Sequence, residues 1–306
     1  MEEIDWEMMS PDACEGWQPP VEGCVVRGMP EGVYHGGPGV SSSRLKIITS
    51  RSELHYRERG LSAAIAPTPA MLTGRVLHAM VLEPESVSQR YRFAAGLKLN
   101  TKAGKQSMAA IKAEAEEAGA EVVRDDEAHL WAMARAISAH PAWDHIIGPA
   151  PMTEVSLFWR DPATGLSLKC RPDNLNLSFG TTGRRALCVD LKSAEDASDR
   201  AFRRSVKEYG YDFSAAMYQA GVAQVTGQQV GWAWFLFEKR APYATRVIYA
   251  GEKWLARGRE LYRDALERLA RAQKTGNWPG YDGGKATVLD FTRWDGLDNT
   301  TTQDTK

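Results

Sequence analysis

Apolar positions along the chain follow helical spacing in some segments and strand-like runs in others, which predicts a protein with both helices and a sheet. Residues 230–238 and 243–250 are rich in aromatic and apolar side chains, as is typical of strands in a sheet core. Residues 251–274 carry leucines at helical spacing and predict a long amphipathic helix. Further helices are expected at residues 43–59, 68–82, 107–118, 125–139, 197–209 and 211–226.

Two short runs on either side of a turn sequence predict a β-hairpin. Residues 154–160 and 166–172 are separated by the sequence DPATG, which is rich in turn-forming residues. If the chain reverses at Ala163, Glu154 lies opposite Pro172 and Asp173 at one end of the sheet. A slip of one residue would turn Glu154 to the other face. Glu154 is therefore either an additional acid beside Asp173 at this end of the sheet or an exposed residue at the start of a strand.

The strand-like run at residues 186–191 leads into the candidate chemistry of the chain. Asp190 and Lys192 are two residues apart, so their side chains should project from the same face of the strand. Asp173 comes at the end of the neighbouring strand and adds a second carboxylate. Carboxylate oxygens suit Mg²⁺, and an ammonium beside them could orient or help deprotonate an attacking water. A D-x-K tripeptide alone is also typical of a solvated surface strand.

The predicted helix at residues 68–82 carries a histidine that is a candidate ligand. It begins after the capping residue Thr68 and ends before Pro84. Gly74 lies one turn before His78 and should allow another backbone to approach this face closely. His78 is either a metal ligand or a hydrogen-bonded structural residue, and the helix alone leaves both interpretations open.

The formal net charge of −1 at pH 7 over 306 residues argues against a protein that coats nucleic acid through bulk electrostatics. Contacts with a phosphate backbone must then come from local basic clusters, and such clusters are otherwise solvated helix faces. Two clusters stand out in the sequence. The first comprises Arg184, Arg185, Arg200, Arg203, Arg204 and Lys207, and the second comprises Lys98, Lys102 and Lys105.

Three serines, Ser41, Ser42 and Ser43, stand where the first predicted helix begins. Free amides at a helix N-terminus can bind a phosphate, and simple N-capping is the alternative.

Cysteine usage and hydropathy predict a reduced, cytoplasmic protein without membrane contact. The four cysteines lack a paired C-x2-C spacing, and Cys170 and Cys188 lie in strand-like runs where core packing is expected. No apolar run reaches the roughly 18 residues that span a bilayer. A Walker-type loop and a Rossmann glycine fingerprint are also missing from the sequence, which argues against an ATP-driven motor.

The domain organisation expected from these patterns is a single α/β domain with a mixed central sheet flanked by helices. Residues 1–33 are rich in Pro and Gly and predict an irregular N-terminal extension. Residues 34–287 form the predicted domain, with a helical N-terminal portion. Residues 288–306 predict a polar, disordered tail.

Taken together, the motifs resemble the exodeoxyribonuclease VIII (RecE-type) branch of the PD-(D/E)xK nucleases. The resemblance extends from about Tyr34 to Tyr281 and rests on the order and spacing of separate motifs. These are Gly74-x3-His78, Leu82-Glu83-Pro84, Thr101-Lys-Ala-Gly-Lys105, Glu154, Arg171-Pro172-Asp173, Asp190-Leu-Lys192 and Tyr209-Gly-Tyr-Asp212 with Tyr218.

The resemblance implies a DNA exonuclease that depends on Mg²⁺ or Mn²⁺, is encoded by a phage or prophage, and acts in the cytoplasm of a bacterial host. Such an enzyme resects the ends of double-stranded DNA and leaves a single strand for a RecT-like annealing partner, and relatives often assemble into homo-oligomers. His78, Asp173 and Asp190 are the implied metal ligands, Lys192 assists the water, and Glu154 is a further catalytic acid. The residues expected to contact DNA phosphates are Ser41, Ser42, Arg75, Lys105, Arg203, Lys207, Ser214 and Tyr218.

One position departs from the family pattern. Related nucleases often carry a Q-x3-Y motif, but the residue four before Tyr218 is Ser214. Gln219 is one position off, which rotates its side chain by about 100 degrees on a helix and should prevent it from substituting. An alternative function is therefore a catalytically impaired module that binds DNA ends or a partner protein. A third option is a metallohydrolase that acts on a small phosphate ester.

Overall fold

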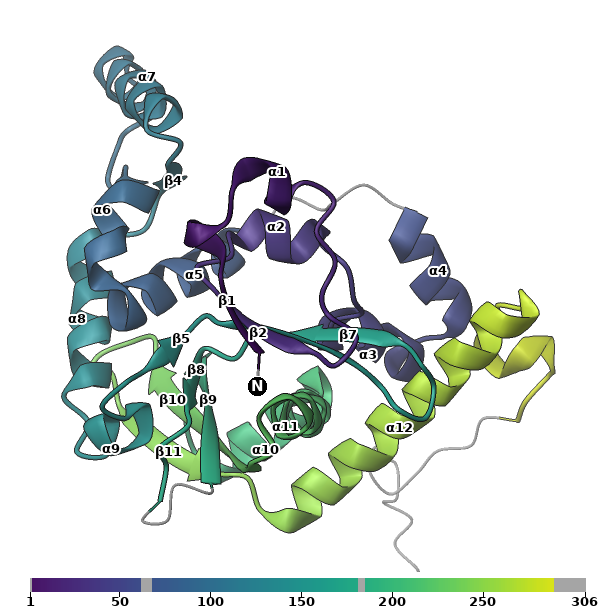
Figure 1. Ribbon diagram of the computed structural model, residues 1–306. Coiled ribbons are helices and arrows are strands. Elements are labelled where there is room, and N and C mark those ends of the chain that lie inside the picture. Colours follow the sequence, from purple (N-terminus) through teal and green to yellow (C-terminus); the bar gives the residue numbers. More distant parts are fainter. Residues whose placement is uncertain (1, 62–67, 181–184, 289–306) are drawn as a thin grey trace, which may run out of the picture.

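A five-stranded mixed sheet forms the centre of the structure, a computed structural model that describes residues 2–61, 68–180 and 185–288 (Figure 1). The strand order is β11-β10-β9-β8-β5, and only β9 and β10 run parallel. The mixed sheet expected from the sequence is confirmed. The strands are β5 (Met152–Thr153), β8 (Asn174–Asn176), β9 (Arg185–Ala194), β10 (Gln229–Glu238) and β11 (Thr245–Tyr249).

Both faces of the central strands are covered by helices, which explains why their sequences are apolar at almost every position. On β9, Cys188 faces one hydrophobic core while Leu187 and Val189 face the other. The Cys188 face packs against α10 (Asp199–Tyr209) and α11 (Tyr211–Thr226). The opposite face packs against α5 (Pro69–Leu82), α8 (Glu127–Ser138) and α9 (Trp143–Ile147).

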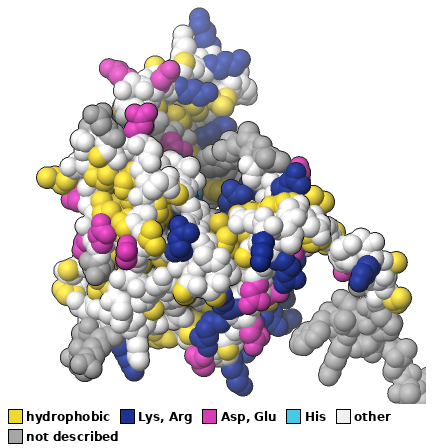
Figure 2. Space-filling model, turned by 45° about the vertical axis from the view of Figure 1, so that its right-hand side comes forward, with side chains coloured by type: hydrophobic (Ala, Val, Ile, Leu, Met, Phe, Trp, Pro, Cys, Tyr) yellow, Lys and Arg dark blue, Asp and Glu magenta, His cyan; other side chains and the backbone are white. Residues whose placement is uncertain are grey.

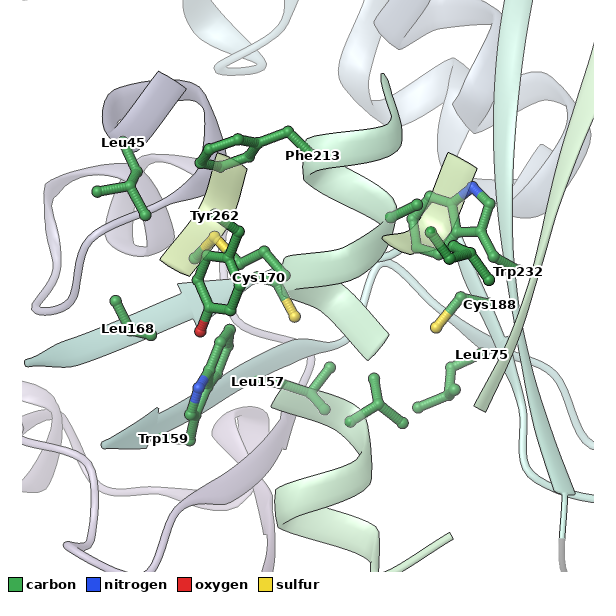
Figure 3. Close-up of a cluster of buried hydrophobic side chains, with 14 of the residues drawn as sticks. Leu45, Leu157, Trp159, Leu168, Cys170, Leu175, Cys188, Phe213, Trp232 and Tyr262 are labelled. Atoms are coloured by element: carbon green, nitrogen blue, oxygen red, sulfur yellow. The ribbon is translucent and has the colours of Figure 1, made fainter. Parts of the chain in front are cut away.

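A second, four-stranded sheet lies on the other side of α11 (Figures 1 and 3). Its order is β1-β2-β6-β7, with β1 (Glu2–Asp5), β2 (Cys24–Arg27), β6 (Ser156–Arg160) and β7 (Ser167–Cys170). Trp159 and Cys170 from this sheet and Trp232 from the central sheet lie around α11 in one core (Figure 3). Gly221 permits this packing, because an added Cβ would lie 2.6 Å from the Trp159 ring.

The predicted hairpin is confirmed, and it joins the two sheets. Trp159 pairs with Leu168 in the second sheet, and Thr153 pairs with Asn174 in the central sheet in the same register. Between these pairs, the Glu154 amide donates to the Asp173 carbonyl at 3.2 Å. Glu154 has a positive φ of 49°, which marks the point where the hairpin leaves one sheet for the other.

The helix expected at residues 43–59 is two helices, α3 (Ser42–Ser50) and α4 (Glu53–Leu61). The sequence-based prediction was wrong here because Arg51 leaves helical geometry, with φ −138°, and the Ser52 hydroxyl then accepts from the His55 amide at 3.4 Å as a new cap. Glu53 and Arg268 form two hydrogen bonds of 2.8 and 2.9 Å. This pair ties α4 to α12 (Glu252–Thr275).

A small subdomain projects from the body of the molecule (Figure 1). Its strands β3 (Tyr91–Phe93) and β4 (Glu121–Val123) flank α7 (Lys102–Glu117), and η2 (Pro84–Ser86) and α6 (Val87–Arg90) connect it to α5. The expected start of α7 at residue 107 was wrong, because Thr101 caps the helix by accepting from the Gly104 amide at 3.0 Å. Figure 2 shows Lys and Arg side chains at the tip of this projection and mixed charges elsewhere on the visible face.

The N-terminal segment is ordered into β1, η1 (Trp6–Met8), α1 (Pro11–Cys14), β2 and α2 (Glu31–Gly36), so the expectation of an irregular extension was wrong. The apolar run of β2 pairs with β6, and Val26, Tyr34 and Phe158 share a small core. The buried Lys169 ammonium donates to the Tyr34 and Gly37 carbonyls at 2.5 and 2.7 Å and thereby anchors α2. The prediction for the tail at residues 288–306 falls almost wholly outside the described residues.

The other elements that were predicted lie within three residues of their expected bounds, whereas β3, β4, β5, β8, α6 and α9 were not predicted. Cys170 and Cys188 are buried as expected. Among the described helices, none is both long and apolar enough to cross a membrane.

Candidate active site

The carboxylate of Asp173 lies where β8 begins, beside the end of β9. Its Oδ2 accepts a hydrogen bond from the Leu191 amide at 2.6 Å, which fixes the side chain against the neighbouring strand. Asp190 and Lys192 lie on the same face of β9, as predicted, and the Lys192 ammonium donates to Asp190 Oδ1 at 2.6 Å. The ammonium also lies 5.4 Å from the centre of the Tyr211 ring.

Helix α5 brings His78 to the two acids at the crossing of the hairpin. His78 Nδ1 lies 3.5 Å from Glu154 Oε1 and 3.6 Å from Asp173 Oδ1. The open question about the Glu154 register is thereby answered, since Glu154 faces the site. Gly74 does not have the expected role, because a Cβ added there would meet no described atom within 4 Å.

The three side chains fit a divalent metal ion. Ligand atoms of His78, Glu154 and Asp173 all lie within 4.8 Å of one another. Carboxylate oxygens suit both Mg²⁺ and Mn²⁺, and the imidazole adds a nitrogen ligand of the kind that first-row transition metals accept. Asp190, predicted as a ligand, lies outside this three-residue group, and its carboxylate is engaged by Lys192.

The charges of the site shift the pKa values of its members. Burial by itself lowers the pKa of His78, but the Asp173 and Glu154 carboxylates outweigh it and raise that pKa to about 9. Burial raises the pKa values of Asp173 and Asp190 above the ordinary carboxyl value. Burial would lower the pKa of Lys192, but Asp190 and Asp173 more than compensate, so the ammonium stays charged.

The site opens into a cleft with a cavity volume of about 730 Å³. Four of the residues expected to contact phosphate line it, namely Ser41, Ser42, Arg75 and Tyr218. Arg75 is paired with Glu31 at 3.2 Å and Glu121 at 2.7 Å. A separate cavity of about 720 Å³ between α11 and α12 contains no cluster of ligating side chains among the described residues, so volume alone does not mark the site.

The start of α3 is not closed by a serine cap. In the described part of the chain, Ser41 makes no side-chain hydrogen bond to the helix amides, and its hydroxyl lies 3.0 Å from that of Ser43. The simple N-capping alternative was therefore wrong. The hydroxyl of Ser42 lies 3.3 Å from that of Ser214, so Ser214 reaches the cleft only through Ser42.

Other predicted contacts lie away from the cleft. The Gln219 amide donates to the Val230 carbonyl at 2.6 Å, which agrees with the expectation that it does not substitute for the family glutamine. Within the described ranges, Lys105, Arg203 and Lys207 do not line the cleft. Arg203 pairs with Asp199 at 3.4 Å on the exposed face of α10, and Arg184 falls outside the described residues.

Three groups near the site were assigned no role from the sequence. Glu31 places an acid from the N-terminal segment in the cleft. Arg171 donates to the Ser156 hydroxyl and the Met29 carbonyl, and its position in the Arg-Pro-Asp motif was a usable signal. Lys46 donates to the Tyr209 carbonyl at 2.9 Å, and burial, with Lys192 nearby, lowers its pKa to about 8.

Comparison with solved structures identifies the fold. A crystal structure of a protein from Eubacterium rectale, described as a "putative exonuclease", is 15% identical to this chain with a TM-score of 0.52. The match covers 88% of this chain and 95% of that chain. A crystal structure of the protein SSO0001 is 13% identical over 73% of this chain and 83% of that chain, with a TM-score of 0.25. No curated protein matches the chain.

The predicted motif residues lie on β9 of the central sheet and at the residue that precedes the adjacent strand β8. Asp173 supplies the first acid after Pro172, and Asp190 and Lys192 supply the D-x-K element on the adjacent strand. The family model described as "PDDEXK-like domain of unknown function (DUF3799)" matches residues 41–291. This match spans most of the chain, and the protein belongs to that family of PD-(D/E)xK-like domains.

Proposed function

We propose that the protein is a divalent-metal-dependent exonuclease that hydrolyses phosphodiester bonds from the ends of linear double-stranded DNA. The observation that supports this most directly is the convergence of His78, Glu154 and Asp173 in one cleft, with the Asp190–Lys192 pair close enough to shift the pKa of Asp173. A pure binding module has no need for a charged lysine next to a set of metal-ligating acids.

In this proposal each side chain of the site has a distinct role. His78, Glu154 and Asp173 hold Mg²⁺ or Mn²⁺, and Asp190 adds negative charge and positions Lys192 through the 2.6 Å hydrogen bond. When bound, the ion stabilises the charge that develops on the phosphate. Because the pKa of Lys192 is raised, its ammonium donates hydrogen bonds that orient the attacking water and does not itself remove the proton.

The choice of substrate rests on resemblance. The motifs resemble RecE-type exonucleases, and the similar structure from Eubacterium rectale is described as a "putative exonuclease". By this reasoning the enzyme acts in a bacterial cytoplasm, is encoded by a phage or prophage, and leaves single strands for a RecT-like annealing protein. A homo-oligomer is part of the same proposal.

The test compares end-labelled linear duplex DNA with closed circular DNA in Mg²⁺, Mn²⁺ or EDTA. The wild type should degrade only linear DNA and only with metal. Asp173→Asn and Lys192→Met should each reduce the rate by at least about a hundredfold. The matched control is Asp196→Asn, which removes an exposed acid near the end of β9 and should leave the rate unchanged.

The second candidate is the module that binds DNA ends or a partner protein without turnover. It is favoured by Ser214, which stands in place of the family glutamine and contacts the Ser42 hydroxyl. Retained binding of DNA ends without any metal-dependent loss of duplex would select this function. Activity on small phosphate esters without activity on DNA would select the metallohydrolase alternative.

A further inference from the structure

A second groove lies between α3 and α4, separate from the candidate active site. It has a cavity volume of about 630 Å³, and its lining includes Arg44, Arg51, Arg59 and His55. Glu58 is the one carboxylate among its lining residues. The groove therefore carries an excess of positive charge in a protein whose formal net charge is −1.

The three arginines of this groove lack an acidic partner within the part of the chain that the structure describes. Among the described residues, none of Arg44, Arg51 and Arg59 forms an ion pair within 4.0 Å. By contrast, the cleft arginines Arg75 and Arg90 are paired with glutamates. Unpaired guanidinium groups in a groove are suited to phosphate, which they can bind through two parallel hydrogen bonds.

The groove is held in shape by its neighbours. The Arg44 guanidinium lies over the Tyr56 ring at 4.9 Å and bridges α3 to α4. Its Nη2 is so close to Gly60 that an added Cβ there would lie 2.6 Å away. The buried Glu53–Arg268 pair fixes α4 on α12. The guanidinium of Arg44 is thus placed before any ligand arrives.

Aromatic rings stand beside these charges. The His55 and Tyr281 rings lie 5.1 Å apart at an angle of 55°. The side chain of His55 lines the groove, and Tyr281 is 61% exposed. An exposed ring of this kind offers a surface on which an unpaired base can stack. Bases in a duplex are already stacked on each other and cannot use it.

The groove adjoins the active-site cleft at the start of α3. Ser43 lines both of them, and Ser41 and Ser42 line the cleft beside it. The intervening surface is the start of α3, where no serine side chain caps the helix amides within the described residues. A chain of phosphates can therefore follow the serines from the cleft into the groove, with an anion-accepting helix terminus between them.

We infer that the groove between α3 and α4 is a binding site for single-stranded nucleic acid and carries one strand of the substrate past the active-site cleft. Arg44, Arg51 and Arg59 bind its phosphates, and Tyr281 stacks on a base. The inference deepens the proposed nuclease function and rests on it for the identity of the strand. Binding can nevertheless be measured without cleavage.

The experiment measures fluorescence anisotropy of a labelled oligothymidylate of about 12 nucleotides in EDTA, a length within the range of known single-strand sites. The test variant Arg51→Glu/Arg59→Glu reverses two groove charges. The control Arg57→Glu/Lys253→Glu reverses two exposed charges that do not line the groove. The test variant should bind about tenfold or more weakly than the control. The slope of log affinity against log salt should also fall by about 1.4, as expected for two lost phosphate contacts.

A second variant tests stacking. Tyr281→Ala should weaken binding of the oligothymidylate about fivefold or more and leave binding of an abasic oligonucleotide of the same length unchanged. Equal binding by Arg51→Glu/Arg59→Glu and by the control would overturn the inference. A wild type that does not bind the oligonucleotide would also overturn it. Blunt duplex that competes as well as single strands would also overturn it.

Cleavage of linear duplex with Mg²⁺ is followed separately for the same proteins. If Arg51→Glu/Arg59→Glu loses oligonucleotide binding and none of the proteins cleaves duplex DNA, the proposed exonuclease activity is refuted while the binding site is supported.

Discussion

The pKa of His78 leads to a quantitative prediction about metal binding. A histidine must be neutral to ligate a metal, and its ordinary pKa is about 6.5. The Asp173 and Glu154 carboxylates raise the pKa of His78 to about 9 in the metal-free protein. At pH 7 only about one molecule in a hundred then has a neutral imidazole, and at pH 8 about one in ten.

The apparent affinity for Mn²⁺ should therefore rise about tenfold from pH 7 to pH 8 and level off above pH 9. About one proton should be released for each ion bound in this range. The measurement is calorimetric titration with Mn²⁺ in buffers that differ in ionisation enthalpy. His78→Ala should bind more weakly, and its affinity should no longer depend on pH between 7 and 8.

Two variants make the reasoning refutable. In Glu154→Gln the apparent affinity for Mn²⁺ should level off at a lower pH, because one of the two carboxylates that raise the His78 pKa is gone. His129→Ala is the matched control, because the His129 ring hydrogen-bonds to Tyr243 away from the site. Its loss should leave the dependence of Mn²⁺ affinity on pH unchanged. The assignment of His78 as a ligand would be refuted if the Mn²⁺ affinity of the wild type did not depend on pH, or if His78→Ala kept the tenfold rise in affinity from pH 7 to pH 8.

Further predictions concern the scaffold. Glu53→Gln weakens the half-buried pair with Arg268, which keeps its contact with Asp264, so the free energy of unfolding from urea titration should fall by about 1 to 2 kcal/mol. Arg268 lowers the pKa of Glu53. The contribution of the pair to the free energy of unfolding is therefore fully present above the ordinary Glu pKa of about 4.3 and is lost as the pH falls through the lowered pKa. Glu53→Gln should not show this acid-dependent decrease. Gly221→Ala forces a methyl group against the Trp159 ring and should cost about 1 to 3 kcal/mol. Gly74→Ala meets no described atom within 4 Å and should leave stability unchanged or raise it by about 1 kcal/mol. The opposite order of melting temperatures for the two glycine variants would contradict the packing around α11.

Local sequence signals were sufficient for the strands and acids of the site. Strand periodicity with a turn sequence predicted the hairpin but left its register open by one residue, and the structure places Glu154 beside Asp173. The i and i+2 rule placed Asp190 and Lys192 on one face of β9. The Thr68 cap gave the start of α5 correctly, since its hydroxyl accepts from the Met71 amide.

The parts that were missed depend on contacts between distant segments. β2 has only a short apolar run, and it becomes a strand because β6 offers a free edge. Glu31 enters the cleft because Arg75, distant in sequence, pairs with it. The pairing of Asp190 with Lys192 was not predicted either, because a strand pattern does not specify which partner a side chain takes. Ser52 is a residue type that can begin a new helix, but the helical spacing on both sides of it favoured the prediction of one continuous helix.

The crossing of the hairpin at Glu154 has a mechanical consequence. The two sheets share this one ribbon, and Glu154 and Asp173 are paired at the point where it passes from one sheet to the other. Points at a pivot stay in place when the bodies on either side tilt. A tilt of one sheet against the other would therefore change the distance between the far ends of β6 and β7 and the central sheet, while the two carboxylates keep their spacing.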